Sequence, residues 1–170
     1  RVFYLLNKKK IPVYADNETE KYLYNSFKYC FKKNSSNYPP ILKFYKLNKI
    51  HNFVKDFENL KIRTVMVRHG SINSVCYIIN DKCAYAPDVN EVFLKDLKYF
   101  RKLKYLIIDC LRYKKHPSHF SFDEVLEFVK KINPKKTILT NLNNEIDYSE
   151  IKKKLPKNII PAYDGLSFLI

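Results

Sequence analysis

Residues 61–88 read KIRTVMVRHGSINSVCYIINDKCAYAPD and predict three short β-strands. The first strand is apolar on both faces in its middle, as a strand buried inside a protein is. Two further apolar runs, residues 74–79 and 83–86, are separated by Asn80 and Asp81. Both residue types tolerate the positive φ of a tight hairpin turn. This stretch therefore predicts the centre of a β-sheet.

Two polar side chains lie where these predicted strands end. His69 is followed by Gly70, and Asp88 is preceded by Pro87. A strand end delivers its side chain to the rim of the sheet, and both residue types are good ligands for a divalent metal. A structural histidine and a turn-capping aspartate are the alternatives that these two positions leave open.

The composition predicts one soluble domain. A length of 170 residues suits a single core, and 46% of the residues are hydrophobic. No apolar run approaches the roughly 20 residues that cross a bilayer, and the chain does not open on a signal-peptide pattern. The four cysteines lack CxxC spacing, which favours a reducing cytoplasm without disulfides or a zinc knuckle. We therefore expect a cytoplasmic protein that does not associate with membranes.

The net charge of +15 invites a nucleic-acid interpretation. However, the lysines are spread through almost every predicted loop and helix and do not form one stripe. The chain is also rich in Lys, Asn, Ile and Tyr, with two glycines and no tryptophan, a bias that AT-rich coding produces by itself. Nucleic acid is accordingly a possible partner, but compositional bias is the favoured explanation of the charge.

The first residues resemble the tail of a helix that is already under way. The chain starts at Arg1 without a methionine, and no N-cap residue precedes the run RVFYLLNKKK. Because of the missing methionine and the missing N-cap, we expect the sequence to be a fragment.

The remaining pattern predicts an α/β (α+β) domain with layered helices. Strands are predicted at residues 11–15, 41–47, 52–57, 105–111, 137–142 and 159–162. One helix is predicted after an N-cap at Asp16 and Asn17, where Asn17 and Glu20 resemble a capping box. Further helices are predicted over 89–100, after a capping box at Ser121 and Glu124, and over 148–155. The first half is rich in strands, and the second half alternates helix and strand.

Polar clusters follow several of these strands. They are His69, Asp88, the pair His116 and His119, and residues 141–144, while Asp109 interrupts an apolar strand. Functional sites are often formed by loops that a sheet positions. The occurrence of several polar clusters at strand ends therefore favours a metal site. Neither GxSxG nor a glycine-rich phosphate loop is present. The two histidines of HPSH could share a ligand or a metal, or His119 could simply pack near the helix start.

At this point the residues resemble a known family. The blocks that carry the resemblance are IPVYAD (11–16), NYPPIL (37–42), VRHGS (67–71), AYAPDV (84–89), IIDCLRYKKHPSHFSFDEVLEF (107–128), ILTNLNNEIDY (138–148) and LPKNIIPAYDG (155–165). In this order they resemble the C-terminal two-thirds of metallo-β-lactamase-fold hydrolases, in the branch of phosphoribosyl cyclic phosphate phosphodiesterase. The resemblance implies that residues 1–170 are a single partial domain, the C-terminal part of a metallo-β-lactamase-like αββα sandwich with a two-metal centre at one edge.

The resemblance also assigns roles to particular residues. It implies that His69 is a metal ligand and that Asp88 bridges two metals. Asn141 falls where many relatives place the last metal-binding histidine and is taken as a further metal ligand. His116 and His119 match the branch's HPxH block and become candidates for catalysis, through a substrate-phosphate contact or proton transfer. The family's HxHxDH motif, which supplies most ligands, does not occur in this sequence.

The implied activity is metal-dependent hydrolysis of a phosphodiester or cyclic phosphate, with zinc or manganese, on a small phosphorylated substrate. Because HxHxDH is missing, this chain alone is expected to bind metal weakly or not at all and to be inactive. Two alternatives remain: an RNA- or DNA-processing nuclease or nucleic-acid binder of the same superfamily, and a non-catalytic truncated interaction module. A homodimer is expected, because an incomplete sandwich exposes apolar sheet surface, most of it within residues 41–86.

Overall fold

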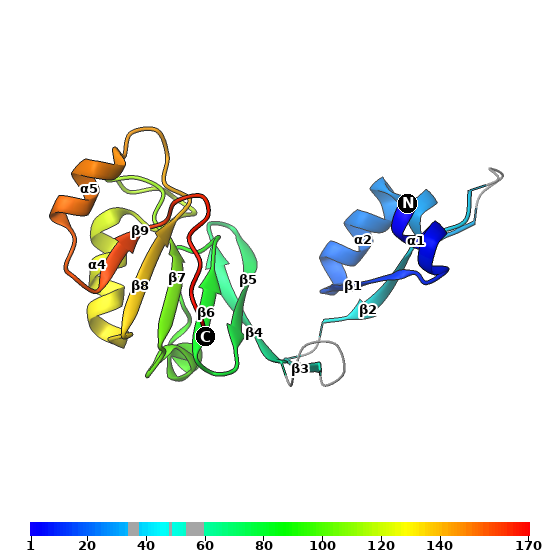
Figure 1. The fold of residues 1–170 in the computed structure, drawn as a ribbon, viewed down its shortest axis with the longest axis horizontal. Helices are drawn as coiled ribbons and strands as arrows, with labels where there is room; N and C mark the ends of the chain where they lie inside the picture. Colours follow the sequence, from blue (N-terminus) through cyan, green and yellow to red (C-terminus); the bar gives the residue numbers. More distant parts are fainter. Residues whose placement is uncertain (34–37, 48, 54–59) are drawn as a thin grey trace. The chain divides into compact units, whose positions relative to one another are not determined.

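A computed structural model of the protein describes residues 1–33, 38–47, 49–53 and 60–170. The chain forms two compact units, residues 1–48 and 49–170 (Figure 1). The expected single domain over residues 1–170 stays a prediction. No helix in the described ranges is long and apolar enough to cross a membrane.

The first unit is a small α/β element. It consists of α1 (Val2–Asn7), β1 (Ile11–Ala15), α2 (Asn17–Ser26), α3 (Lys28–Phe31) and β2 (Leu42–Lys46), and its two strands pair in parallel. The ring of Phe31 stacks on Phe44 with centroids 3.9 Å apart. Of the two residues expected as the N-cap, Asp16 caps α2: its carboxylate accepts the backbone N–H groups of Glu18 and Thr19. The capping box expected between Asn17 and Glu20 is wrong, because Asn17 is already the first helical residue.

The second unit is a seven-stranded sheet whose strand order follows the chain. Its elements are β3 (Ile50–Phe53), β4 (Leu60–His69), β5 (Ile72–Ile79), β6 (Cys83–Ala86), η1 (Leu94–Phe100), β7 (Tyr105–Asp109), α4 (Phe122–Ile132), β8 (Lys136–Thr140), α5 (Tyr148–Lys154) and β9 (Ile159–Pro161). Strands β3 to β6 pair antiparallel, and β6 to β9 pair in parallel. This mixed α/β architecture agrees with the predicted fold class.

The central hairpin turns where the sequence indicated. Asn80 and Asp81 have φ values of 51° and 53°, in the left-handed region. The Asn80 side chain accepts the backbone N–H of Lys61 at 2.8 Å, and the Lys61 ammonium lies 2.6 Å from Asp81. The turn therefore also fastens the beginning of β4.

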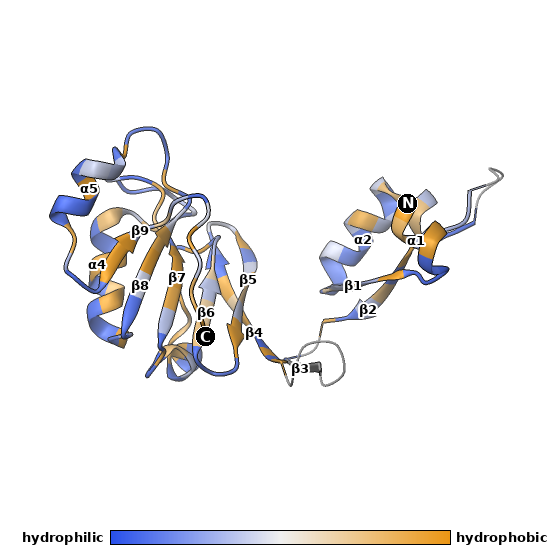
Figure 2. Ribbon diagram, viewed as in Figure 1, coloured by the Kyte–Doolittle hydropathy of each residue, from blue (hydrophilic) through white to orange (hydrophobic). Residues whose placement is uncertain are grey.

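One face of the large sheet carries the core. Its fully buried strand residues include Val67, Ile78, Leu106, Ile108 and Leu139, which form one cluster with the apolar side of α4. Figure 2 shows the hydrophobic residues running along β7, β8 and β9. The capping box at Ser121 and Glu124 is present, as predicted, and fixes the start of α4.

Two stretches differ from the sequence-based expectation. The predicted helix over 89–100 is wrong in its first half, and only η1 is helical, as a 3₁₀ helix. The segment before η1 runs beside β4 instead, where the backbone N–H of Arg68 bonds the carbonyl of Glu91 at 2.9 Å. Of the strand expected over 52–57, Asn52 and Phe53 lie in β3, which begins two residues earlier, and residues 54–59 lie outside the described residues, as do residues 34–37 of the expected loop.

Candidate metal centre

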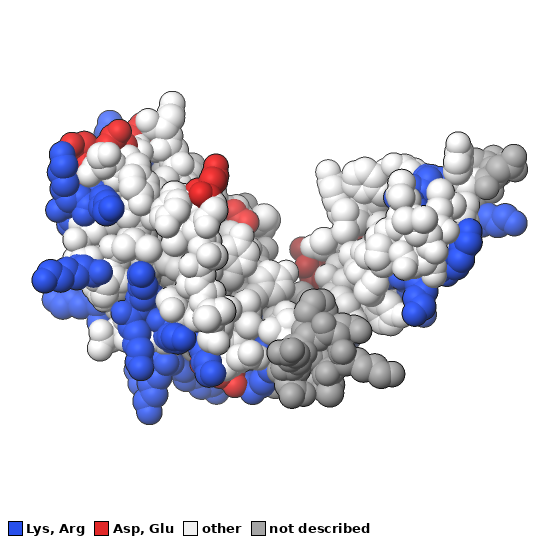
Figure 3. All heavy atoms as spheres, in the orientation of Figure 1, with Lys and Arg blue, Asp and Glu red and all other residues white. Residues whose placement is uncertain are grey.

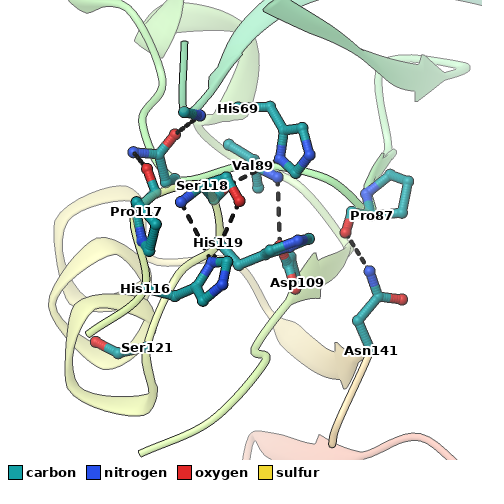
Figure 4. A network of polar contacts seen from close by, with 12 residues as sticks. His69, Pro87, Val89, Asp109, His116, Pro117, Ser118, His119, Ser121 and Asn141 are labelled. Carbon is teal, nitrogen blue, oxygen red and sulfur yellow. Dashed lines mark hydrogen bonds and ion pairs between the residues drawn. The ribbon is translucent and has the colours of Figure 1, made fainter. Parts of the chain in front are cut away.

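Three side chains converge at one edge of the large sheet. His69 ends β4, Asp88 follows β6, and His119 belongs to the loop that follows β7. These three strands all run in the same direction, because β5 is antiparallel to both β4 and β6 and β6 is parallel to β7. Each of the three residues offers one ligand atom, and these atoms all lie within 4.8 Å of one another. Figure 4 shows the two histidines, His69 and His119, at this edge. The expected proximity of His69 and Asp88, with His119 beside them, is confirmed.

The ring of His69 is oriented by a backbone carbonyl. Its Nδ1 lies 2.8 Å from the carbonyl oxygen of Ser118. A carbonyl can only accept a hydrogen bond, so the proton of neutral His69 resides on Nδ1. The lone pair of Nε2 is then available for a metal ion, which is the tautomer that metal-binding histidines need.

The ring of His119 is held by a buried carboxylate. Its Nδ1 contacts Oδ2 of Asp109, which has no exposed surface and also accepts the backbone N–H of Val89 at 3.4 Å. The pKa of Asp109 is raised to about 6, because the effect of burial outweighs the opposing hydrogen bond and charge of His119. The remaining oxygen, Oδ1, is buried without a hydrogen-bond partner among the described residues. This contact leaves Nε2 of His119 available in the same way.

The donor set fits one divalent ion. Two imidazoles and one carboxylate are a common protein ligand set for catalytic zinc, and each imidazole is oriented by an acceptor on its other nitrogen. Ligands about 2.0–2.2 Å from one tetrahedral ion are about 3.3–3.6 Å apart. The three side chains, whose ligand atoms lie within 4.8 Å of one another, would therefore close in by up to about 1.5 Å when an ion binds. In the described part of the chain, no second group of three such residues is present.

The loop that carries His119 is locked against the turn after β4. Gly70 has a φ of +63°, and a Cβ added there would lie 2.9 Å from the Cβ of Ser118. The backbone N–H of Gly70 bonds the side-chain oxygen of Asn90 at 2.9 Å, and the Asn90 amide donates to the carbonyl of Pro117 at 3.4 Å. Only glycine allows this close approach, which brings the HPSH loop onto His69.

Replacing Gly70 by alanine should lower the free energy of unfolding by about 1–3 kcal/mol, because the variant combines backbone strain with a steric clash. Gly165→Ala is the matched control, since Gly165 also has a positive φ, +88°, but has no atom within 4 Å of an added Cβ. Chemical denaturation of both variants separates the clash from the strain. Equal losses of unfolding free energy in the two variants would show that the close approach to Ser118 does not affect stability.

His116 lies beside this group with a different hydrogen-bond pattern. Its Nδ1 accepts the backbone N–H of Ser118 at 3.3 Å, and its ring centroid lies 5.1 Å from that of His119. Desolvation and the nearby charge of Arg112 lower the pKa of His116. The neutral ring therefore carries its proton on Nε2. Arg112 also bonds the carbonyls of Lys114 and Lys115, which shapes this loop.

Asn141, the third expected metal ligand, lies at the end of β8 with a φ of 59°. Its side-chain amide donates to the carbonyl of Pro87, the residue before Asp88. Asn141 thereby supports the backbone that presents Asp88, and its role as a ligand stays a prediction. The roles of His116 and His119 in catalysis stay predictions as well.

Asp109 is the functional candidate that the sequence interpretation did not assign. The available signal was a carboxylate at the end of an otherwise apolar strand, in the run YLIID. Such a residue is costly to bury unless it has a partner. The partner, His119, lies ten positions further along the chain and could not be deduced from that signal alone.

The fold and this site define a metallo-β-lactamase-type protein. Residues 3–140 match the family model described as the β-lactamase superfamily domain, which is most of the chain. The chain therefore belongs to the metallo-β-lactamase superfamily.

Known structures of this superfamily resemble the chain. A diphosphatase from the PhnP family aligns with a TM-score of 0.82 and 25% identity, over 95% of this chain and 59% of its own. Zinc-bound PqqB from Methylobacterium extorquens aligns with a TM-score of 0.69 and 13% identity, over 98% of this chain and 67% of its own. At that identity PqqB supports the fold alone.

A curated relative is 24% identical over 164 residues, the octanoyltransferase of Porphyromonas gingivalis. The match covers 95% of this chain but 33% of that protein. The chain thus spans about a third of this relative and 59% of the diphosphatase.

Proposed function

We propose that this chain carries part of the active site of a metal-dependent hydrolase that acts on a phosphodiester or cyclic phosphate. The observation that carries the proposal is the convergence of His69, Asp88 and His119, each histidine with its Nδ1 engaged and its Nε2 available. Zinc and manganese are the candidate ions. When bound, a divalent ion supplies positive charge that stabilises the charge developing on a phosphoryl oxygen.

The residues of this chain have separable tasks in that reaction. His69, Asp88 and His119 hold the ion, and Asp109 fixes the ring of His119. The Nε2–H of His116 donates a hydrogen bond to a phosphate oxygen, since its Nδ1 already accepts the N–H of Ser118.

A pocket at the same edge is suited to a small substrate. It has a volume of about 270 Å³ and lies at the ends of β8 and β9, where it is lined in part by Asn141, Tyr163 and Asp164. Asn141 connects this pocket to the ion site through its bond to the carbonyl before Asp88. A small phosphorylated compound is therefore the substrate class that we propose.

Phosphate binding tests the proposal directly. The zinc-loaded chain should bind inorganic phosphate, and the binding should disappear when the metal is removed with a chelator. Turnover of cyclic phosphates and of bis(p-nitrophenyl) phosphate is then measured on the polypeptide expressed from the gene's own start codon. Phosphate binding that is indifferent to metal, together with no turnover, would rule out the proposed hydrolase.

His116→Leu should weaken phosphate binding by the zinc-loaded chain roughly tenfold, because leucine cannot donate the hydrogen bond, and a hydrogen bond to a charged group contributes about 1.5–3 kcal/mol. Lys114→Gln, in the same loop but exposed, serves as the control for a change of side chain near the site. Calorimetric titration with phosphate measures both. An unchanged affinity in His116→Leu would exclude a contact between His116 and the substrate.

The homodimer also remains a proposal. On the sheet face away from α4, Met66 and Tyr85 have exposed fractions of 39% and 40%. Apolar sheet surface of this kind favours association, and a second copy is the simplest partner. Sedimentation velocity at micromolar concentration tests the proposal, and a stable monomer would reject it.

A further inference from the structure

A row of four lysines crosses the edge of the sheet opposite to the candidate metal centre. Lys82, Lys104 and Lys135 immediately precede β6, β7 and β8, and Lys157 lies two residues before β9. These strands are adjacent and parallel. The lysine row, defined by these four residues, is therefore formed by the starts of four neighbouring strands.

Backbone hydrogen bonds hold the members of the row side by side. The N–H of Lys104 bonds the carbonyl of Lys82 at 2.8 Å, and the carbonyl of Lys104 accepts the N–H of Lys136, which follows Lys135, at 3.0 Å. Neighbouring strands lie about 4.8 Å apart, so the row spans about 14 Å. All four side chains are exposed.

Little negative charge compensates this row. Further cations come from the same loops and helix ends, namely Lys98, Arg101, Lys102, Lys130, Lys131 and Lys136. Asp81 is the one acid within residues 80–82, 98–104, 130–136 and 156–158, and it already pairs with Lys61 and Arg63. Within the described ranges none of the four lysines forms an ion pair, although Lys104 donates to the carbonyl of Leu169. Figure 3 shows the basic side chains gathering along the lower edge of this unit.

The positive charge of the lysine row has no evident stabilising role in the fold. Lys130 and Lys131 lie in the last turn of α4, where cations offset the helix dipole. No member of the lysine row lies in a helix, so that reason does not apply to the row. Like charges on adjacent strands repel one another, which makes the row a net cost unless an anion binds there.

We propose that the lysine row is a docking site for the phosphate backbone of a single-stranded nucleic acid. Such a backbone is a linear series of evenly spaced anions, which matches a linear series of ammonium groups. The adjacent Leu103 and Ile132 are buried and offer nothing to a bilayer, whereas Leu169, whose carbonyl accepts from Lys104, is exposed, so vesicle binding is measured as well. Binding releases the counterions that the row would otherwise hold, and this release drives the association.

This surface is independent of the proposed hydrolase. The metal centre lies where the parallel strands end, and the row lies where they start. A strand of five residues such as β7 separates the two edges by about 16 Å. Binding is therefore measured in the presence of EDTA, so that a failure of the hydrolase proposal leaves this test unaffected.

The experiment uses a fluorescein-labelled oligouridylate and fluorescence anisotropy over a series of salt concentrations. Four phosphate contacts predict a slope of about −3 for the logarithm of the affinity against the logarithm of the salt concentration. The test variant combines the substitutions Lys82→Gln, Lys104→Gln, Lys135→Gln and Lys157→Gln. The matched control, with the same net charge, combines exposed lysines of the first unit in Lys9→Gln, Lys10→Gln, Lys21→Gln and Lys28→Gln.

We expect the test variant to lose at least tenfold in affinity at low salt and most of the salt slope, and the control to lose much less. Arginine at the same four positions keeps the charge and should keep the binding, which guards against a folding defect in the glutamine variant. Equal losses in the test variant and the control would overturn the proposal, since net charge alone would then explain the binding. Row-dependent binding to phosphatidylserine vesicles without binding to the oligonucleotide would also overturn it.

Discussion

Replacing Asp88 by asparagine should lower the affinity of this chain for zinc by roughly 100-fold or more. Asp88 is the one carboxylate in the group with His69 and His119, so the substitution removes the negative charge of that group. Loss of a residue that merely orients a ligand already costs about 10–100-fold in metal affinity, and loss of a ligand itself should cost more.

Competition with a chromophoric chelator measures this affinity, even though the wild-type chain is expected to bind metal weakly. Asp123→Asn provides the control, because Asp123 is an exposed carboxylate in the first turn of α4. Similar affinities for wild type and Asp88→Asn would mean that zinc binds elsewhere on the protein.

Replacing Asp109 by asparagine should reduce zinc affinity by about 10–100-fold, although Asp109 is not a ligand. The carboxylate holds Nδ1 of His119 and so keeps Nε2 free for the ion. An asparagine amide can instead donate to the ring, which would shift the proton of His119 to Nε2 and block the ligand atom. Because asparagine has the same size, the core around residue 109 should stay intact.

Two readouts distinguish this positioning role from simple unfolding. Nuclear magnetic resonance of the ring nitrogens should report a changed tautomer for His119 in Asp109→Asn, and circular dichroism should report an unchanged fold. Val89 also donates to this carboxylate at 3.4 Å, so a modest loss of stability is expected. An unaltered tautomer together with wild-type zinc affinity would exclude the positioning role of Asp109.

Much of the fold could be predicted from local sequence patterns. The hairpin at Asn80 and Asp81, the capping box at Ser121 and the positions of most strands depend on neighbouring residues, and these features were predicted. The segment before η1 has helical spacing of apolar residues, but pairing with Arg68 on β4 determined its conformation. A tertiary hydrogen bond of that kind is not visible in a local pattern.

In the candidate site, too, the features set by neighbouring residues could be predicted, whereas those set by tertiary contacts could not. His69 and Asp88 could be predicted because each ends a recognisable strand. The contact between Asp109 and His119 depends on how the HPSH loop folds back over β7, which Gly70 permits by its close approach to Ser118. The lysine row depends on strand register, because its members are 22 to 31 positions apart in the sequence.

Zinc X-ray absorption spectroscopy of the metal-loaded chain tests the central claim most directly. The account predicts scattering from two imidazole rings and a nitrogen or oxygen shell at about 2.0–2.1 Å. His69→Ala and His119→Ala should each remove one imidazole. A spectrum without imidazole, or one that neither substitution changes, would contradict the assignment of these residues to the metal centre.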